Sequence, residues 1–235
     1  MSAPVVVLVG VQLAENLGAV ARVMANFGLR ELRLVAPEAS PEDARAVAMA
    51  THGVDVLAEA RTYATLADAL ADVHAAWGTA ALPRAREAGV WHPRAMASHL
   101  RRSGLRHALV FGPERTGLSA EDTARLDGVV RIPTDAACRA LNLAQAVAIL
   151  AWEWSSSEVE EAAGVAPADA EPAPVEAFDA FFGAFGDALV AAGWLSDPTL
   201  RPNTLTTLRQ ALRRAGFTRG ELGTLHGAVR ALVRR

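Results

Sequence analysis

The sequence of 235 residues contains no lysine, so all 23 of its basic residues are arginine. Biased codon usage explains this absence more simply than selection for function, but the physical consequence is the same in both cases. Every side-chain cation is a planar guanidinium that can hold a phosphate through two parallel hydrogen bonds. The net charge of −3 therefore conceals a set of cations that all suit phosphate contacts.

Cysteine and long apolar runs are also scarce. The single cysteine, Cys138, excludes an internal disulfide framework. No apolar run approaches the roughly 20 residues that a membrane-spanning helix needs. The opening residues 1–4 lead directly into an apolar run, without the basic and then apolar order of a signal peptide. We therefore expect a cytoplasmic protein with no membrane partner, and its 51% hydrophobic content is ample for a full core.

Motifs for several common chemistries are missing as well. The histidines show no ligand spacing with Cys138 or a carboxylate, so we predict no metal site. No Gly-x-Ser-x-Gly turn surrounds a nucleophilic serine. No Gly-x-Gly-x-x-Gly follows the first strand, which counts against a nicotinamide-binding enzyme. The histidines are His52, His74, His92, His99, His107 and His226.

What the sequence does contain, from Val5 to about Trp154, is a regular alternation of strand-like and helical patterns. Such alternation predicts an α/β domain with a parallel sheet, here assigned to residues 1–154. The expected strands are Val5–Gly10, Glu31–Val35, Val54–Leu57, Val73–Gly78, His107–Phe111 and Val129–Ile132. The expected helices include Asn16–Phe27, Pro41–Ala50, Leu66–Ala71, Pro93–Arg102 and a closing helix Leu141–Trp154.

The composition changes after residue 154. Residues 155–177 carry six acidic side chains and three prolines but no basic partner, which predicts an acidic, flexible linker. Residues 178–235 return to helical patterns and form a predicted C-terminal extension. Its first helix has an apolar stripe at three- and four-residue spacing. That stripe consists of Phe178, Phe181, Phe182, Phe185 and Leu189.

The extension ends in a basic stretch. Asp197-Pro198 interrupts the helical pattern, and Leu205–Ala215 and Glu221–Val233 predict two further helices. Arginines outnumber acidic residues heavily from Arg201 onward. A solvated basic face and a phosphate-contacting surface explain this charge about equally well.

Three segments that contain glycines, amides and charged residues each follow an apolar strand. The first contains Glu15–Arg22 and Asn26–Leu29, the second is Gly112–Leu118, and the third joins Arg131–Thr134 to Leu141–Val147. Ligands of open parallel sheets bind at the carboxyl ends of the strands. The three segments therefore predict one composite site.

The residues of these segments allow more than one role. Asn16 and Asn142 suit helix N-caps, and Asn142 would also suit ligand binding. Arg22 would be either solvated or directed across an interface. The turn Gly112–Leu118 has two glycines that permit close ligand approach, but its spacing fits neither a P-loop nor a dinucleotide fingerprint. Glu114 disfavours a phosphate beside it, which favours a ligand with partly cationic character.

Taken together, the segments resemble the three motifs of the SpoU/TrmH class of the SPOUT superfamily. The matching stretches are Asn16–Arg22 with Asn26–Gly28, then Val110–Ser119, then Ile132-Pro133 with Leu141–Val147. The tail, Leu208–Ala215 with Glu221-Leu222 and Leu225–Gly227, resembles the extension of one subgroup. That subgroup comprises bacterial tRNA (cytidine/uridine-2′-O)-methyltransferases. The resemblance covers nearly the whole chain and is weakest between Ala80 and Ser103 and in the linker.

The resemblance implies a fold and a reaction. The fold would be a Rossmann-like parallel sheet with a C-terminal trefoil knot and a small helical extension. The reaction would be methylation of a ribose 2′-oxygen by S-adenosylmethionine, on a tRNA cytidine or uridine at anticodon-loop nucleotide 32. The partners would be the tRNA anticodon stem-loop and a second copy, in a homodimer formed through the knot region. Ribosomal RNA remains an alternative substrate.

The resemblance also implies residue roles. Arg22 would reach the partner protomer's methyl donor and help to activate the ribose hydroxyl. Asn16 and Asn142 would orient the ribose and Arg22, and Glu114 would support the loop and Arg22 electrostatically. The donor would lie among the residues of the knot, with no metal. These donor-binding residues are Thr79, Ala80, Ala81, Gly112, Ile132, Arg139, Ala140 and Leu141.

One position departs from the family pattern. The family usually has a serine, regarded as catalytic, directly before Leu-Asn-Leu, and this chain has Ala140 there. The change removes one hydrogen bond to the ribose or to a phosphate. It therefore leaves open a second function, a knotted RNA-binding protein with impaired catalysis.

Overall fold

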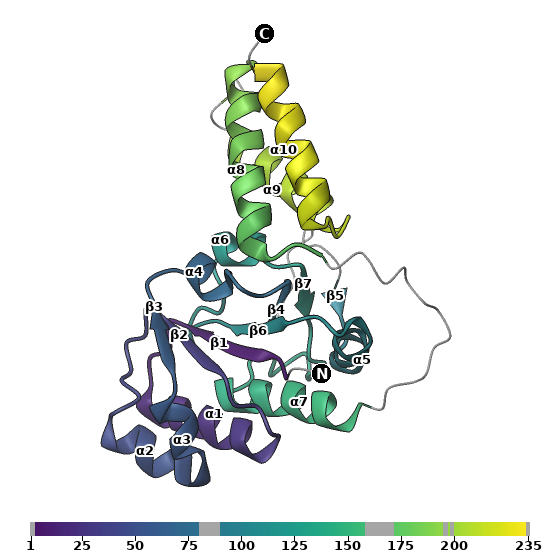
Figure 1. Cartoon of the computed structure of the whole chain (residues 1–235). Helices are drawn as coiled ribbons and strands as arrows, with labels where there is room; N and C mark the ends of the chain where they lie inside the picture. The colour runs from purple at the N-terminus through teal and green to yellow at the C-terminus, as the bar shows by residue number, and fades with distance from the viewer. Residues whose placement is uncertain (1–2, 80–89, 158–171, 195–196, 198–199, 234–235) are drawn as a thin grey trace. The chain divides into compact units, whose positions relative to one another are not determined.

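The computed structural model describes residues 3–79, 90–157, 172–194, 197 and 200–233. The chain divides into two compact units, Met1–Ala162 and Ala163–Arg235, which are described separately. The first unit is built around a sheet with helices on its faces, and the second consists of helices (Figure 1).

The sheet of the first unit has seven strands in the order β3-β2-β1-β6-β4-β7-β5, and all neighbours are parallel. Strand β1, the third in this order, pairs with both β2 and β6, with Val6 opposite Leu32 on one side and Leu109 on the other. The predicted α/β class with a parallel sheet is therefore confirmed. The strands are β1 (Val5–Val9), β2 (Leu32–Val35), β3 (Arg61–Tyr63), β4 (Ala75–Thr79), β5 (Val90–Trp91), β6 (His107–Phe111) and β7 (Gly128–Val130).

Apolar helix faces cover the sheet. Helices α1 and α7 pack against each other in the main core, to which they contribute Leu17, Val20, Val147 and Leu150. In Figure 1 both helices lie on the same side of the sheet. The helices are α1 (Ala14–Asn26), α2 (Ala44–Ala50), α3 (Val54–Ala58), α4 (Leu66–Leu70), α5 (Pro93–Ser103), α6 (Ala120–Ala124) and α7 (Leu143–Ser156), with a 3-10 turn η1 (Thr51–Gly53).

The sequence prediction was wrong at Val54–Leu57, which is not a strand but most of helix α3. A four-residue apolar run has no distinctive period, and here it continues the helical turns of α2 and η1. The strand that pairs with β2 is instead Arg61–Tyr63. Its exposed Arg61 and Thr62 give it no apolar signal.

A buried histidine lies at the start of β6. His107 is 3% exposed; Trp77 Nε1 donates to its Nδ1 at 3.4 Å, and its Nε2 lies 2.5 Å from Ser103 Oγ. Since Nδ1 accepts, the ring proton belongs on Nε2. Burial, together with smaller contributions from the neighbouring His99 and His74, lowers the pKa of His107 from 6.5 to about 4. The folded state therefore holds this imidazole neutral.

We expect His107 to make the protein less stable in mild acid. Between pH 6.5 and about 4 the unfolded chain binds a proton that the folded chain does not, so stability falls as the pH drops. The expected loss is about 3 kcal/mol. Urea unfolding at several pH values measures this loss. In the His107→Gln variant the free energy of unfolding should depend less on pH, even if the substitution itself destabilises the protein. An unchanged slope in that variant would contradict the assignment.

The second unit has three helices, α8 (Val175–Ala191), α9 (Arg201–Arg213) and α10 (Arg219–Val233), among its described residues. The phenylalanine stripe forms its core, with Phe178 and Phe181 buried beside Leu222. The helices predicted here are confirmed, although α9 begins before Leu205, with Pro202 in its first turn. Pro is well tolerated at the start of a helix.

Helices occupy both ends of the segment predicted to be a linker. Helix α7 continues through Ser156, and α8 begins at Val175, so both ends of residues 155–177 are helical. Residues 158–171 lie outside the described part of the chain. No described helix has the length and apolar character that a membrane span requires.

Two tail arginines serve the core of the second unit. Arg209 pairs with Asp179 at 2.5 Å and lies over the Phe178 ring at 5.3 Å, and Arg213 lies over the same ring at 5.1 Å. Cations stack favourably on aromatic faces. Arg214, Arg219 and Arg230, in contrast, are exposed and have no side-chain partner among the described residues.

Candidate functional site

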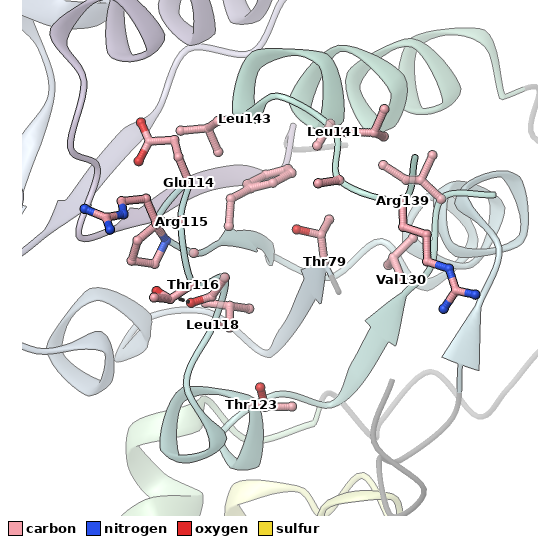
Figure 2. A pocket seen from close by; sticks show the side chains of 17 residues that line it. Thr79, Glu114, Arg115, Thr116, Leu118, Thr123, Val130, Arg139, Leu141 and Leu143 are labelled. Carbon is pink, nitrogen blue, oxygen red and sulfur yellow. Dashed lines mark hydrogen bonds between the residues drawn. The ribbon is translucent and has the colours of Figure 1, made fainter. Parts of the chain in front are cut away.

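A pocket of about 350 Å³ opens at the carboxyl ends of three neighbouring strands, β4, β6 and β7 (Figure 2). Thr79, Phe111 and Val130 are the last residues of those strands, and all three line it. The other lining residues come from the second and third motif segments and from α6. They are Gly112–Leu118, Thr123, Ile132, Arg139, Ala140, Leu141, Leu143 and Ala146.

The pocket brings together most residues that the sequence assigned to donor binding. Six of them line it: Thr79, Gly112, Ile132, Arg139, Ala140 and Leu141. Ala80 and Ala81, also assigned to donor binding, lie outside the described residues. Of the four residues assigned to catalysis, Glu114 lines the pocket, whereas Asn16, Arg22 and Asn142 do not.

The turn after β6 is shaped by Gly112. A Cβ atom on Gly112 would lie 2.3 Å from the backbone of Gly117 and Leu118, so the loop can fold back on itself only because this residue has no side chain. Gly117 adopts a φ of +65°, and a Cβ there would meet nothing within 4 Å. The loop wall of the pocket therefore depends on two glycines for different reasons.

Glu114 fixes the beginning of helix α1. Its carboxylate accepts hydrogen bonds from the backbone amides of Gln12 and Leu13, at 3.1 and 3.3 Å, and from Asn16 Nδ2 at 2.8 Å. The N-cap residue Leu13 has no side chain that could cap the helix. A carboxylate at a helix N-terminus satisfies free amides and complements the helix dipole. Glu114 thus holds α1 in place from about a hundred residues away.

Three donors keep Glu114 ionised. Partial burial alone would raise the pKa of this carboxyl, but the hydrogen bonds from Asn16, Gln12 and Leu13 hold it below its ordinary value. Figure 2 shows the carboxylate pointing away from the cavity. The expectation that Glu114 would repel a phosphate in the pocket is therefore weakened, because its charge is engaged elsewhere.

Asn142 joins the third motif segment to the first. Its Nδ2 donates to Asn16 Oδ1 at 2.8 Å, while its Oδ1 caps α7 by accepting from the backbone amide of Ala144. Gln145 completes a capping box with the Asn142 backbone. The N-cap role and the inter-segment contact therefore coexist at Asn142. The side chains of Asn142, Asn16 and Glu114 form one hydrogen-bonded chain beside the pocket.

Arg22 stands apart from this chain. It is exposed on α1 and makes no hydrogen bond or ion pair with any residue that the structure describes. Six residues beyond Asn16, it lies about 120° around the helix and ~9 Å further along it. Arg22 therefore does not serve the pocket of its own protomer in this geometry.

The sequence analysis missed the backbone amides of Gln12 and Leu13 and the lining residues Thr123 and Leu143. The type of a residue does not indicate whether its backbone amide will donate a hydrogen bond to the site. The one available signal was the uncapped start of α1, where the apolar Leu13 occupies the N-cap position. Thr123 lies on the short helix α6, where only its position in space brings it to the pocket.

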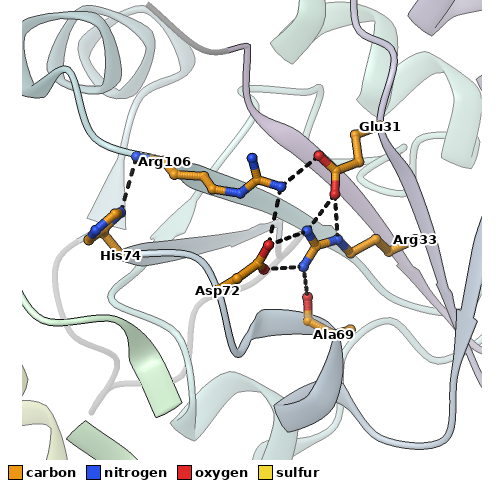
Figure 3. Close-up of polar contacts among 6 residues, drawn as sticks. All are labelled: Glu31, Arg33, Ala69, Asp72, His74 and Arg106. Carbon is orange, nitrogen blue, oxygen red and sulfur yellow. Dashed lines mark hydrogen bonds and ion pairs between the residues drawn. The ribbon is translucent and has the colours of Figure 1, made fainter. Parts of the chain in front are cut away.

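A second group of charged residues lies at the opposite, amino end of the strands (Figure 3). Arg33 is 2% exposed and bonds Asp72, Glu31 and the carbonyl of Ala69. Arg106 pairs with the same two carboxylates, with Glu31 at 2.7 Å and with Asp72 at 3.2 Å. Although burial opposes it, the hydrogen bonds that Arg33 donates to Asp72 and Glu31 raise the pKa of Arg33, and Arg33 lowers the pKa of Asp72. This cluster ties strand ends together.

Two motif segments line a pocket at the carboxyl edge of a parallel sheet, and Asn16 joins the first segment to them by hydrogen bonds; this arrangement defines the class. The chain belongs to the SpoU rRNA methylase family, whose sequence model matches residues 3–152. The family assignment confirms the predicted fold class and the predicted class of enzyme, a SpoU/SPOUT RNA 2′-O-methyltransferase.

Relatives resemble the chain over almost its whole length. A tRNA (cytidine/uridine/adenosine-2′-O-)-methyltransferase TrmJ from Pseudomonas aeruginosa is 32% identical, over 95% of this chain and 91% of its own. The crystal structure of TrmJ from Z. mobilis ZM4 matches with a TM-score of 0.89 at 33% identity, covering 98% of this chain and 99% of that one. The predicted resemblance to this tRNA-modifying subgroup is therefore confirmed.

A more distant structure shares the fold alone. The SpoU methyltransferase AviRb from Streptomyces viridochromogenes, solved in complex with AdoMet, has a TM-score of 0.52 at 16% identity. The match covers 65% of this chain and 56% of AviRb. Within the described ranges of the present chain, no group of three or more His, Cys, Asp or Glu residues could hold a metal ion.

Proposed function

We propose that this protein transfers a methyl group from S-adenosylmethionine to a ribose 2′-oxygen of tRNA in the cytoplasm. The substrate we propose is a cytidine or uridine at nucleotide 32 of the anticodon loop. One observation carries the proposal: the pocket and the Asn16–Asn142–Glu114 chain unite three motif segments in a protein that matches TrmJ enzymes from end to end.

The pocket has the size and chemistry for the methyl donor. Its volume of about 350 Å³ lies within the range of small-molecule sites. Leu118, Val130 and Ile132 offer apolar walls for a base, while Thr79 and Thr116 supply hydroxyls. The AdoMet complex of AviRb, a protein of the same fold, supports this assignment. The donor supplies an activated methyl group on a sulfonium.

The protein must align the ribose and remove its hydroxyl proton. In our proposal, Asn16 and Asn142 orient the ribose through amide groups that their mutual hydrogen bond holds in place. Glu114 positions Asn16 and α1, and takes no proton. Arg22 stays protonated and stabilises the developing alkoxide, because a guanidinium is a poor base, and the hydroxyl proton passes to solvent water.

Arg22 can act only if another protomer places it beside a pocket, since it does not line its own. We therefore propose a homodimer, with helix α7 and the knot region that the family implies at the interface. The exposed Trp152 on α7 supports an apolar contact there.

Two alternative functions are also supported by particular observations. Ala140 lines the pocket without a hydroxyl, which favours an RNA-binding protein with slow or absent turnover. Ribosomal RNA is the other candidate substrate, since the family model carries that description.

Nucleoside analysis by mass spectrometry distinguishes these readings. Purified protein is incubated with methyl-labelled donor and with either tRNA or ribosomal RNA, in the presence of a chelator. We expect a labelled 2′-O-methylcytidine or 2′-O-methyluridine from the anticodon loop of tRNA alone. Label in ribosomal RNA would replace the proposed substrate, and bound RNA without label would favour the impaired protein.

The exposed tail arginines should contribute to tRNA binding. Replacing Arg214, Arg219 and Arg230 together with Gln should weaken binding and reduce the slope of log affinity against log salt by up to about 3. Donor binding and thermal stability should change little, because these side chains are exposed and form no hydrogen bond or ion pair with the described residues. Arg209→Gln should instead lower the stability of the second unit. A triple variant with the wild-type salt slope would show that this basic face is merely solvated.

A further inference from the structure

Arg139 holds an unusual position in the loop between β7 and α7. It lines the pocket, yet its side chain is exposed, and Figure 2 shows the guanidinium pointing away from the cavity. Its Nε donates to the carbonyl of Ala136 at 3.1 Å, and Thr134 Oγ1 donates to the Arg139 carbonyl at 3.4 Å. The two terminal nitrogens bond none of the residues described. A partly fixed guanidinium therefore presents its free edge at the mouth of the pocket.

The charge at this mouth is positive. The charged residues that line the pocket are Glu114, Arg115 and Arg139. Three hydrogen bonds direct the carboxylate of Glu114 toward α1, whereas Arg115 is exposed and lacks a carboxylate partner in the described parts of the chain. Neither arginine forms an ion pair with a described residue, which favours a polyanion at this entrance.

Position 140 adds a chemical reason for a phosphate contact here. Ala140 lines the pocket directly after Arg139 and offers no hydroxyl to a ribose or a phosphate. A guanidinium one residue away can donate two charge-assisted hydrogen bonds to one phosphate, which a hydroxyl cannot do.

We propose that Arg139 binds a backbone phosphate of the RNA strand beside the target ribose, and that this contact replaces one that a hydroxyl at position 140 would make. The inference rests on the proposed function and names a substrate-binding residue in its site. Arg139 then sets the affinity for RNA, while the methyl donor is held by the pocket behind it.

The test compares Arg139→Gln with wild type and with Arg61→Gln in the full-length protein. Arg61 is a matched control because it is exposed, has no side-chain partner among the residues described, and lies on β3 at the other edge of the sheet. For Arg139→Gln we expect the KM for tRNA to rise about tenfold. The salt slope of tRNA binding should fall by about one. Donor affinity should stay within twofold of wild type in both variants.

Two further variants separate charge from geometry. Arg139→Lys should keep the wild-type salt slope, because it keeps the charge. Its KM for tRNA should lie between those of wild type and Arg139→Gln, because an ammonium cannot form the forked contact. Adding Ala140→Ser to the Arg139→Gln variant should lower its KM for tRNA part of the way toward wild type. The salt slope of tRNA binding should stay at the reduced value.

If Arg139→Gln binds tRNA with the wild-type KM and salt slope while wild type methylates tRNA, the role of Arg139 is wrong and the proposed function stands. If wild type methylates no RNA, the proposed function fails. The salt slope of RNA binding still decides the role of Arg139 in that case, because it needs no turnover.

Discussion

Gly112→Ala is expected to weaken S-adenosylmethionine binding by about a hundredfold, the equivalent of about 3 kcal/mol. The added Cβ would lie 2.3 Å from the backbone of Gly117 and Leu118, and backbone cannot move aside as the end of a flexible side chain can. The loop must therefore open, and the wall of the pocket moves with it. Calorimetric titration with the donor or its demethylated product, in a chelator, measures the loss.

Gly117→Ala is the matched control on the same loop. Its φ of +65° makes alanine strained, at a cost of about 1 kcal/mol, but a Cβ there meets no atom within 4 Å. We expect a loss of donor affinity below tenfold. Equal losses in both variants would mean that backbone strain, and not the clash at Gly112, controls the pocket. If Gly112→Ala bound the donor with wild-type affinity, the assignment of the donor to this pocket would be wrong.

Arg22→Gln is expected to lower kcat by two to three orders of magnitude while the donor affinity and the melting temperature remain those of wild type. A preorganised donor to a developing oxyanion is typically worth a factor of about 10² to 10³. The stability should not change, because Arg22 is exposed and has no partner within the described residues. Light scattering should give twice the chain mass of 24.7 kDa for both proteins.

Mixed dimers test whether Arg22 acts on the partner. Arg22→Gln retains a good pocket, and Gly112→Ala retains a good Arg22, so each is nearly inactive alone. If Arg22 acts across the interface, a dimer of the two variants has one complete site. Random exchange of protomers should then restore about a quarter of wild-type activity. No recovery after confirmed exchange would place Arg22 beside its own pocket, and a monomeric protein would exclude action across an interface.

Much of the fold was predictable because its buried strands are continuous apolar runs. Val5–Val9 and His107–Phe111 are long enough to be identified by composition, and parallel pairing follows from the helices between them. Elements with few residues or little burial were not predictable. The edge strand Val90–Trp91 has two residues, and the apolar run Val54–Leu57 has no period that separates strand from helix.

The residues of the candidate site were predictable only as a set. The rule that ligands bind at strand ends brings Gly112 and Ile132 together, and the family resemblance adds Thr79; all three line the pocket. It does not give side-chain directions. Glu114 was expected to affect the ligand by its charge, but backbone amides that residue types do not reveal turn it toward α1. Arg139 was assigned to the donor, and its exposed guanidinium became apparent only with the loop geometry.

The hydrogen-bonded chain beside the pocket also determines when the site can form during synthesis. Asn16 binds Glu114, 98 residues later, and Asn142, 126 residues later. Strand β1 likewise has both of its edges paired only after β6 has been synthesised. A ribosome must therefore release almost the entire first unit before the whole site is complete. Until then an apolar strand lacks a neighbour, a state prone to aggregation, so translation speed and chaperones should govern the yield of active protein.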